Sequence, residues 1–306
     1  MSTQAKQKAV VTGGAGFIGS HLVRALLTEG YEVHVIDNYA AGRFPERVSS
    51  DAVYHEGDIR DAALLEQVLK DTSVVFHTAA LPRVQFSLEH PLETHDVNVS
   101  GTLHVLEASR KAGVQRVVYS ASSSAYGNQD QLPLIESMQA HPISPYALQK
   151  YVGEQYCRLY AEVYALPTVS LRYFNVYGPH ADPFGAYALV VSKFVQQRKE
   201  GMPLTIAGDG TNTRDYTHVS DIVRANILAS KSDAAGKGEV FNIGGGQNIS
   251  VLEVANLIGG EVTHIEARLE PKDTLADTSK AKGMLGWEPT VIFADGVQEL
   301  KEIAGI

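Results

Sequence analysis

Tyr146 and Lys150 stand four residues apart in a proline-free stretch, 146–165, that we predict to be helical. Residues four apart share one face of a helix, so the phenol and the ammonium should lie side by side. A phenol with a pKa of about 10 is a poor base at neutral pH. A neighbouring ammonium favours the phenolate. The pair could therefore remove a proton from a substrate hydroxyl.

Ser122 lies just beyond a strand-like run, 116–120, and starts a series of three serines. A hydroxyl at the carboxyl end of a parallel strand would face the same cleft as the helix residues. We predict that Ser122 hydrogen-bonds the oxygen that Tyr146 deprotonates, which makes Ser122, Tyr146 and Lys150 the candidate catalytic residues. The alternative is a polar turn whose serines satisfy its own backbone.

A glycine-rich segment, 12–19, follows the first predicted strand and opens the first predicted helix. Gly13, Gly16 and Gly19 have the spacing of a dinucleotide-binding turn, in which glycines permit a tight turn and a close approach to a pyrophosphate. The helix N-terminus that follows would offer N–H groups to the phosphates. Asp37 lies 24 residues after Gly13, near the offset of about 20 expected for a ribose-binding acid. A carboxylate there repels a 2′-phosphate and favours NAD over NADP.

Other residues at predicted strand ends complete the cofactor site. Asp58 follows the third strand and could meet the adenine amino group, although it or Asp61 could equally cap a helix. Ala79 and Ala80 are small enough to let the cofactor pass. The predicted cofactor-binding residues are Gly13, Gly16, Phe17, Ile18, Gly19, Asp37, Asn38, Asp58, Ile59, Ala79, Ala80, Asn98, Ser120, Tyr146, Lys150, Tyr173 and Val176.

Alternating strand and helix patterns must position these residues. Apolar runs rich in Val and Ile resemble strands buried on both faces of a parallel sheet. They lie at 8–12, 32–36, 52–55, 73–76, 116–120, 168–172 and 240–243. We predict an α/β fold with a doubly wound parallel sheet of about seven strands. A further helix should begin near Ser250, with Glu253 completing a capping box.

Composition excludes several classes of protein. The 306 residues are 44% hydrophobic and 20% charged, unlike a disordered or disulfide-scaffold chain. The net charge of −9 argues against a nucleic-acid partner. Cys157 is the single cysteine and should be a buried thiol. We expect no metal site, no leader peptide and no membrane span, and hence a cytoplasmic protein.

These residues, together with the run Leu171–Pro179 and the segment Gly210–Val219, resemble the extended short-chain dehydrogenase/reductase family, and within it the nucleotide-sugar 4-epimerases. The resemblance implies a Rossmann-type domain over 1–175, rejoined by 219–245, and a smaller α/β nucleotide-sugar domain over 176–306. It also implies bound NAD, a UDP-sugar substrate and a homodimer formed by helices around 97–112 and 146–165. Asn175 would contact the sugar nucleotide, while Arg214 and Arg268 would clamp its diphosphate.

Differences between this sequence and other branches of the family indicate which reaction to expect. Ser123 and Ser124 stand where sugar dehydratases and uronate decarboxylases carry carboxyl groups, which favours epimerisation. The small Thr274 resembles the residue that leaves room for a 2-acetamido group, so UDP-GlcNAc and UDP-GalNAc are the expected substrates. The predicted substrate-binding residues are Ser122, Ser123, Ser124, Tyr146, Asn175, Tyr187, Ala188, Arg214, Arg268 and Thr274. Epimerases of UDP-glucose, UDP-uronate or UDP-pentose, a 4-keto-sugar reductase and a non-catalytic NAD-binding protein remain alternatives.

Overall fold

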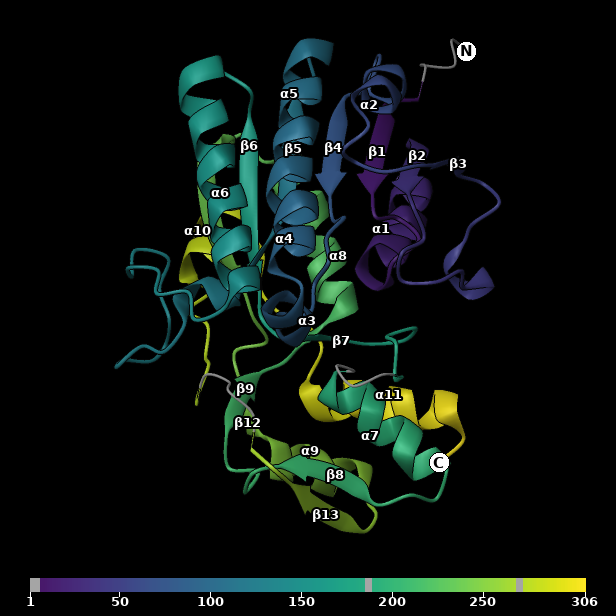
Figure 1. The fold of residues 1–306 in the computed structure, drawn as a ribbon, viewed down its shortest axis with the longest axis vertical. Coiled ribbons are helices and arrows are strands. Elements are labelled where there is room, and N and C mark those ends of the chain that lie inside the picture. The colour runs from purple at the N-terminus through teal and green to yellow at the C-terminus, as the bar shows by residue number, and fades with distance from the viewer. Residues whose placement is uncertain (1–5, 185–188, 268–271) are drawn as a thin grey trace.

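A seven-stranded parallel sheet forms the larger part of the molecule (Figure 1). The computed structural model describes residues 6–184, 189–267 and 272–306. The predicted doubly wound α/β sheet is confirmed, and each of its strands overlaps a predicted Val- and Ile-rich run. The strands in spatial order are β11 (Lys237–Ile243), β6 (Thr168–Tyr173), β5 (Arg116–Ser122), β4 (Val74–His77), β1 (Lys8–Thr12), β2 (Glu32–Asp37) and β3 (Val53–Glu56).

Alternate residues of each strand enter two different hydrophobic cores, because side chains alternate across a sheet. Val11 of β1 packs in the core that contains Trp287, whereas its neighbour Val10 packs in the core that contains Cys157. Cys157 is fully buried, as predicted. Burial on both faces explains why these strands are continuous apolar runs in the sequence.

Helices cover both faces of this sheet. One face carries α1 (Phe17–Thr28), α8 (Val219–Lys231) and α10 (Ser279–Leu285), and the other carries α2 (Ala62–Val68), α5 (Thr102–Ala112) and α6 (Pro145–Tyr164). Between β4 and α5 lie α3 (Val84–Glu89), α4 (Pro91–His95) and the π-helix η2 (Asp96–Gly101). Short 3-10 helices are η1 (Pro45–Arg47) and η3 (Ser123–Tyr126).

The long helix α6 begins one residue before Tyr146. Pro145 occupies its first turn, where a missing N–H costs nothing, and the Ser144 hydroxyl accepts a hydrogen bond of 3.2 Å from the Ala147 N–H. The Ser87 hydroxyl of α3 accepts a second bond, of 3.0 Å, from the Tyr146 N–H. The start of α6, and with it the backbone of Tyr146, is therefore fixed by the Ser144 cap and by a contact with α3.

A smaller unit lies beyond the carboxyl ends of the sheet strands (Figure 1). Its core includes Phe194, Ile206 and Val254. The predicted capping box of Ser250 and Glu253 is confirmed at the start of α9. Its elements are β7 (Val176–Tyr177), α7 (Val190–Lys199), β8 (Leu204–Ala207), β9 (Thr213–Asp215), β10 (Thr217–His218), β12 (Asn248–Ser250), α9 (Val251–Ile258), β13 (Val262–Ile265) and α11 (Phe293–Ala304).

Among the residues described, no helix is both long enough and apolar enough to span a bilayer. The same residues contain no cluster of three or more His, Cys, Asp or Glu side chains suited to a metal ion.

Candidate active site

The turn between β1 and α1, with the first turn of α1, has glycine positions that leave no room for a side chain. Gly13 has a φ of +72°, and a Cβ added there would lie 2.7 Å from the Cα of Ala79. A Cβ on Gly19 would lie 2.1 Å from the Gly13 carbonyl oxygen. Gly16 caps α1 without any side-chain hydrogen bond, and the first turn carries no acid. The N–H groups of Phe17 and Ile18 therefore open the helix with its positive dipole end unneutralised, which fits a pyrophosphate.

Asp37 ends β2 beside this turn, as predicted. Its two carboxylate oxygens accept hydrogen bonds from the Ala15 N–H at 2.9 Å and the Tyr39 N–H at 2.7 Å. Each carboxylate oxygen retains a further lone pair for a ribose hydroxyl. Asp37 thus both fixes the glycine turn and stays half-buried at the strand end, so the residues present fit a dinucleotide.

Asp58 is an ion-pair partner rather than a free acceptor. The Arg60 guanidinium donates to both of its carboxylate oxygens at 2.8 Å, and the exposed Asn38 amide donates at 3.0 Å. These bonds, with Arg60 contributing most, lower the pKa of Asp58 to about 2. Of the two residues that could cap a helix, it is Asp61 that does so, because its carboxylate caps α2. Ile59, which lies between Asp58 and Arg60 in the chain, is buried.

The residues that follow β4 contact the start of the glycine turn. The Ala79 N–H donates to the Thr12 hydroxyl at 3.3 Å, and Ala79 and Ala80 are both partly exposed. Asn98, predicted to bind the cofactor, instead holds this loop: its amide accepts from the Leu81 N–H at 2.8 Å and donates to the Leu81 carbonyl oxygen at 3.1 Å. Asn98 is buried within the π-helix η2, a structure that is frequent at functional sites.

Ser122, Tyr146 and Lys150 meet at the carboxyl edge of the sheet. The Lys150 ammonium is buried and donates to the Ser120 carbonyl oxygen at 2.8 Å. Burial lowers the pKa of Lys150 to about 8. Burial also raises the pKa of Tyr146, and the effect that opposes it is a hydrogen bond with Ser122. In the chain alone, burial therefore outweighs the effects that favour the phenolate.

The predicted cofactor contacts Ser120 and Tyr173 lie in the core behind the catalytic residues. The Ser120 hydroxyl and the Tyr173 hydroxyl are 3.0 Å apart, and the Asn226 amide donates to Tyr173 at 2.7 Å. Burial raises the pKa of Tyr173 to about 12, so its phenol stays neutral. Val176 follows in β7 and is half-buried.

The predicted substrate residues cluster around β9. The Asn175 amide donates to the Asp215 carbonyl oxygen at 3.1 Å, and Asn175 has a φ of +22°. Arg214 donates to the carbonyl oxygens of Thr213 and Lys272, both at 2.9 Å. The Thr274 hydroxyl accepts from the Asp215 N–H at 3.3 Å. The predicted residues Tyr187, Ala188 and Arg268 lie outside the described residues.

Two buried titratable groups lie near the site, and sequence reasoning assigned neither of them a role. The Asp215 carboxylate accepts from the N–H groups of Gly245 at 2.6 Å and Ala276 at 2.9 Å, and burial raises its pKa to about 7. His77 lies between the hydroxyls of Thr12 at 2.7 Å and Thr102 at 3.0 Å. The glycine run after β11 was the available signal for Asp215. Nothing near His77 in the sequence points to its distant partner on α5.

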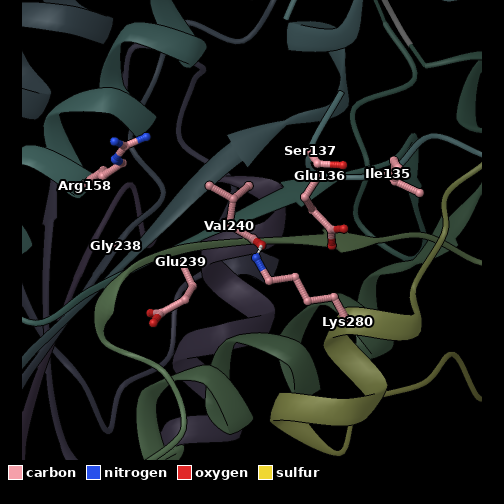
Figure 2. Close-up of a pocket in the computed structure, with 8 residues that line it drawn as sticks. All are labelled: Ile135, Glu136, Ser137, Arg158, Gly238, Glu239, Val240 and Lys280. Carbon is pink, nitrogen blue, oxygen red and sulfur yellow. Dashed lines mark hydrogen bonds between the residues drawn. The ribbon is translucent and has the colours of Figure 1, made fainter. Parts of the chain in front are cut away.

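A hollow of about 420 Å³ lies elsewhere, along the free edge of β11 (Figure 2). Figure 2 shows Lys280 reaching the strand, where its ammonium donates to the Val240 carbonyl oxygen at 2.8 Å. The Glu136 carboxylate accepts from the Asn242 N–H at 2.8 Å. Lys280 and Glu136 thus hydrogen-bond backbone groups that an edge strand leaves unpaired. This structural role of the side chains around the hollow requires no ligand.

The fold and the site define a dinucleotide-binding α/β protein with a tyrosine–lysine pair at the cofactor's end of the sheet. Residues 9–244 match the model of the NAD dependent epimerase/dehydratase family. The chain belongs to this family, and its cofactor is NAD.

Named relatives resemble almost the whole chain. UDP-glucose 4-epimerase of Mycolicibacterium smegmatis is 37% identical over 308 residues, covering 96% of this chain and 97% of the relative. The UDP-glucose 4-epimerase structure of Thermotoga maritima, solved with UDP-glucose, has a TM-score of 0.92 at 38% identity and covers 97% and 98% of the two chains. UDP-N-acetylglucosamine 4-epimerase of Methanobrevibacter ruminantium, solved with UDP-N-acetylmuramic acid, has a TM-score of 0.92 at 34% identity, with coverages of 99% and 100%.

Proposed function

We propose that this chain is a UDP-sugar 4-epimerase that interconverts UDP-GlcNAc and UDP-GalNAc. The observation that carries the reaction type is the convergence of Ser122, Tyr146 and Lys150 at the sheet edge that also bears the glycine turn. The names of the relatives support the nucleotide sugar as substrate and C4 as the reacting carbon.

In this proposal Tyr146 takes the proton of the sugar 4-hydroxyl. Ser122 donates a hydrogen bond that holds the reacting oxygen, and the buried Lys150 supplies positive charge beneath it. NAD, when bound, would be the oxidant for C4, and its oxidised form would be restored within each cycle. Because burial raises the pKa of Tyr146, the phenol needs positive charge beyond that of the chain before it acts as a base. The reverse steps on the other face of the sugar then invert C4.

The serines beside Ser122 support epimerisation over elimination or decarboxylation. Ser123 and Ser124 carry hydroxyls at the two positions that follow the catalytic serine. Water elimination and decarboxylation need an acid or base at that place, whereas inversion at C4 needs no acid–base group there besides Tyr146. A net reductase would consume a reduced cofactor in each turnover, whereas an epimerase regenerates its own.

The choice of sugar rests on Thr274, a small residue that resembles the one that leaves room for a 2-acetamido group in related epimerases. UDP-glucose is the second candidate, because the relatives that share most of the chain's length include UDP-glucose 4-epimerases. Purified protein should be incubated separately with UDP-GlcNAc, UDP-glucose and UDP-glucuronate, without added NADH. NMR of the C4 epimers then ranks the three. If the protein converts only UDP-glucose, the proposed preference for N-acetylated sugars is wrong. If it converts none of the three, the proposal of a UDP-sugar 4-epimerase is wrong.

The matched variant for this experiment is Tyr146→Phe. It should lower turnover by about a thousandfold or more, because it removes the proton acceptor, while UDP-sugar affinity measured by calorimetry stays near that of the wild type. Near-normal turnover would contradict the role of Tyr146 as the base.

We also propose a homodimer formed by α5 and α6. The outward face of α6 exposes Leu148, Leu159 and Val163, the last to 61%. A second copy that covers this apolar stripe is the occupant we propose. Light scattering of the wild type should give twice the chain mass, and Val163→Glu should give monomers. Ile303→Glu, at a 64% exposed position on α11, should leave the dimer intact. A monomeric wild type would contradict the proposal.

A further inference from the structure

The hydroxyl oxygen of Ser122 receives two hydrogen bonds from one residue, Ser124. The Ser124 backbone N–H donates at 3.2 Å, and the Ser124 hydroxyl donates at 2.8 Å. Both residues are half-buried at the end of β5, where Ser122 caps the 3-10 helix η3. The capping geometry therefore brings Ser124 back onto the oxygen of Ser122.

A serine hydroxyl has two lone pairs and one hydrogen. When both lone pairs accept from Ser124, the hydrogen of Ser122 must point to a third group. Tyr146 is that group in this structure, because a hydrogen bond joins the two side chains and the Ser122 oxygen has no lone pair left to accept it. A donor to the Tyr146 oxygen favours the phenolate.

We infer that Ser124 is a positioning residue: by donating to Ser122, it directs the single Ser122 hydrogen toward the Tyr146 oxygen. This inference rests on the proposed function. It also revises the sequence-based role of Ser124, because the hydroxyl hydrogen predicted to bind substrate is already donated to Ser122.

The bonds form a directed chain from Ser124 through Ser122 to Tyr146. Each donor in such a chain polarises the next, which strengthens the final bond to the phenolate. Ser124→Ala keeps the backbone N–H but frees one lone pair of Ser122. The Ser122 hydroxyl can then rotate, and its hydrogen is no longer fixed on Tyr146. The expected result is a smaller fraction of Tyr146 phenolate at neutral pH, with unchanged geometry of the nucleotide-sugar contacts around β9.

The experiment is an NMR titration of NAD-loaded protein labelled at the tyrosine ring carbon that bears oxygen, with the Tyr146 signal assigned by its loss in Tyr146→Phe. Ser124→Ala should raise the Tyr146 pKa by about one pH unit. The phenolate fraction changes about tenfold per pH unit, so kcat at neutral pH should fall about tenfold. KM for the UDP-sugar should change less than about threefold. Ser124→Thr restores a hydroxyl and should return the pKa to within about 0.3 of the wild type.

Ser123→Ala is the matched control for the titration. Ser123 carries the same hydroxyl one residue earlier, and its removal should leave the Tyr146 pKa at the wild-type value whatever it does to KM. A Tyr146 pKa that moves by less than about 0.3 in Ser124→Ala, or by equal amounts in both variants, would overturn the inference. Because the titration needs no sugar substrate, a wild type that turns over no UDP-sugar would refute the proposed function separately.

Discussion

The buried ammonium of Lys150 donates to the backbone carbonyl oxygen of Ser120 at 2.8 Å, across the gap between α6 and β5. Burial lowers the pKa of Lys150 to about 8, from an ordinary value of 10.5. Between pH 8 and 10.5 the unfolded chain binds more protons than the folded one, so stability should rise with pH through this window. Below pH 8 the charged Lys150 lowers the stability of the folded protein.

Lys150→Met should therefore separate stability from activity. It removes a buried charge, so the thermal midpoint at pH 7 should rise by about 2–6 °C, an effect on the order of 1–3 kcal/mol. Turnover should fall at least about a hundredfold, because Tyr146 loses its cationic neighbour. Lys280→Met is the control: Lys280 donates likewise to the Val240 carbonyl oxygen, but outside the site, so its loss should not raise the midpoint. A less stable Lys150→Met would contradict the prediction.

His77 should make the folded protein sensitive to acid. Burial lowers its pKa to about 3, well below the unfolded value of 6.5. The neutral imidazole therefore contributes stability that is fully present above pH 6.5 and is lost as the pH falls toward 3. Urea unfolding of the wild type should lose on the order of 2 kcal/mol from this group between pH 6.5 and 5.

His77→Gln should be less stable at pH 7.5, because one of the bonds to Thr12 and Thr102 is lost, but its stability should depend less on pH. Burial raises the pKa of the Asp215 carboxyl to about 7, so its contribution to stability falls as the pH rises toward 7, opposite to that of His77. Both the wild type and His77→Gln contain Asp215, so its contribution cancels when their stabilities are subtracted. His264→Gln, at an exposed histidine, should parallel the wild type. Parallel curves for His77→Gln as well would show that His77 titrates normally.

The strand ends could be predicted from the sequence because burial on both sheet faces imposes long apolar runs, and the glycine turn because close contacts exclude side chains at Gly13 and Gly19. The prediction of Ser122 used the same strand ends, whereas that of Tyr146 and Lys150 used the spacing of residues on a helix face. The bonds of His77 and Asn98 could not be predicted, because each depends on how elements far apart in the chain pack. The raised pKa of Tyr146 was missed for a related reason: the spacing to Lys150 shows proximity, whereas desolvation depends on the whole surrounding fold.

Arg214→Ala should weaken nucleotide binding. Its guanidinium donates to the carbonyl oxygens of Thr213 and Lys272, which fixes it beside β9, and a planar guanidinium suits the diphosphate proposed to bind there. UDP affinity by calorimetry should fall about tenfold or more, with kcat changed far less. Arg214→Lys keeps the charge without the planar fork and should be intermediate. Arg198→Ala, on the exposed surface of α7, should bind UDP like the wild type.

Thr274→Tyr tests the choice of sugar. Thr274 is buried, and its hydroxyl accepts from the Asp215 N–H at 3.3 Å, next to Arg214. A tyrosine there should occupy the space proposed for the acetamido group, so kcat/KM for UDP-GlcNAc should fall at least about tenfold more than kcat/KM for UDP-glucose. Thr274→Val keeps the volume but loses the bond to Asp215, and it shows what that loss alone does to both substrates. Thermal unfolding of each variant reports whether the larger side chain is accommodated. If a folded Thr274→Tyr lowers both rates equally, Thr274 does not border the acetamido group, and the preference for N-acetylated sugars loses its structural basis.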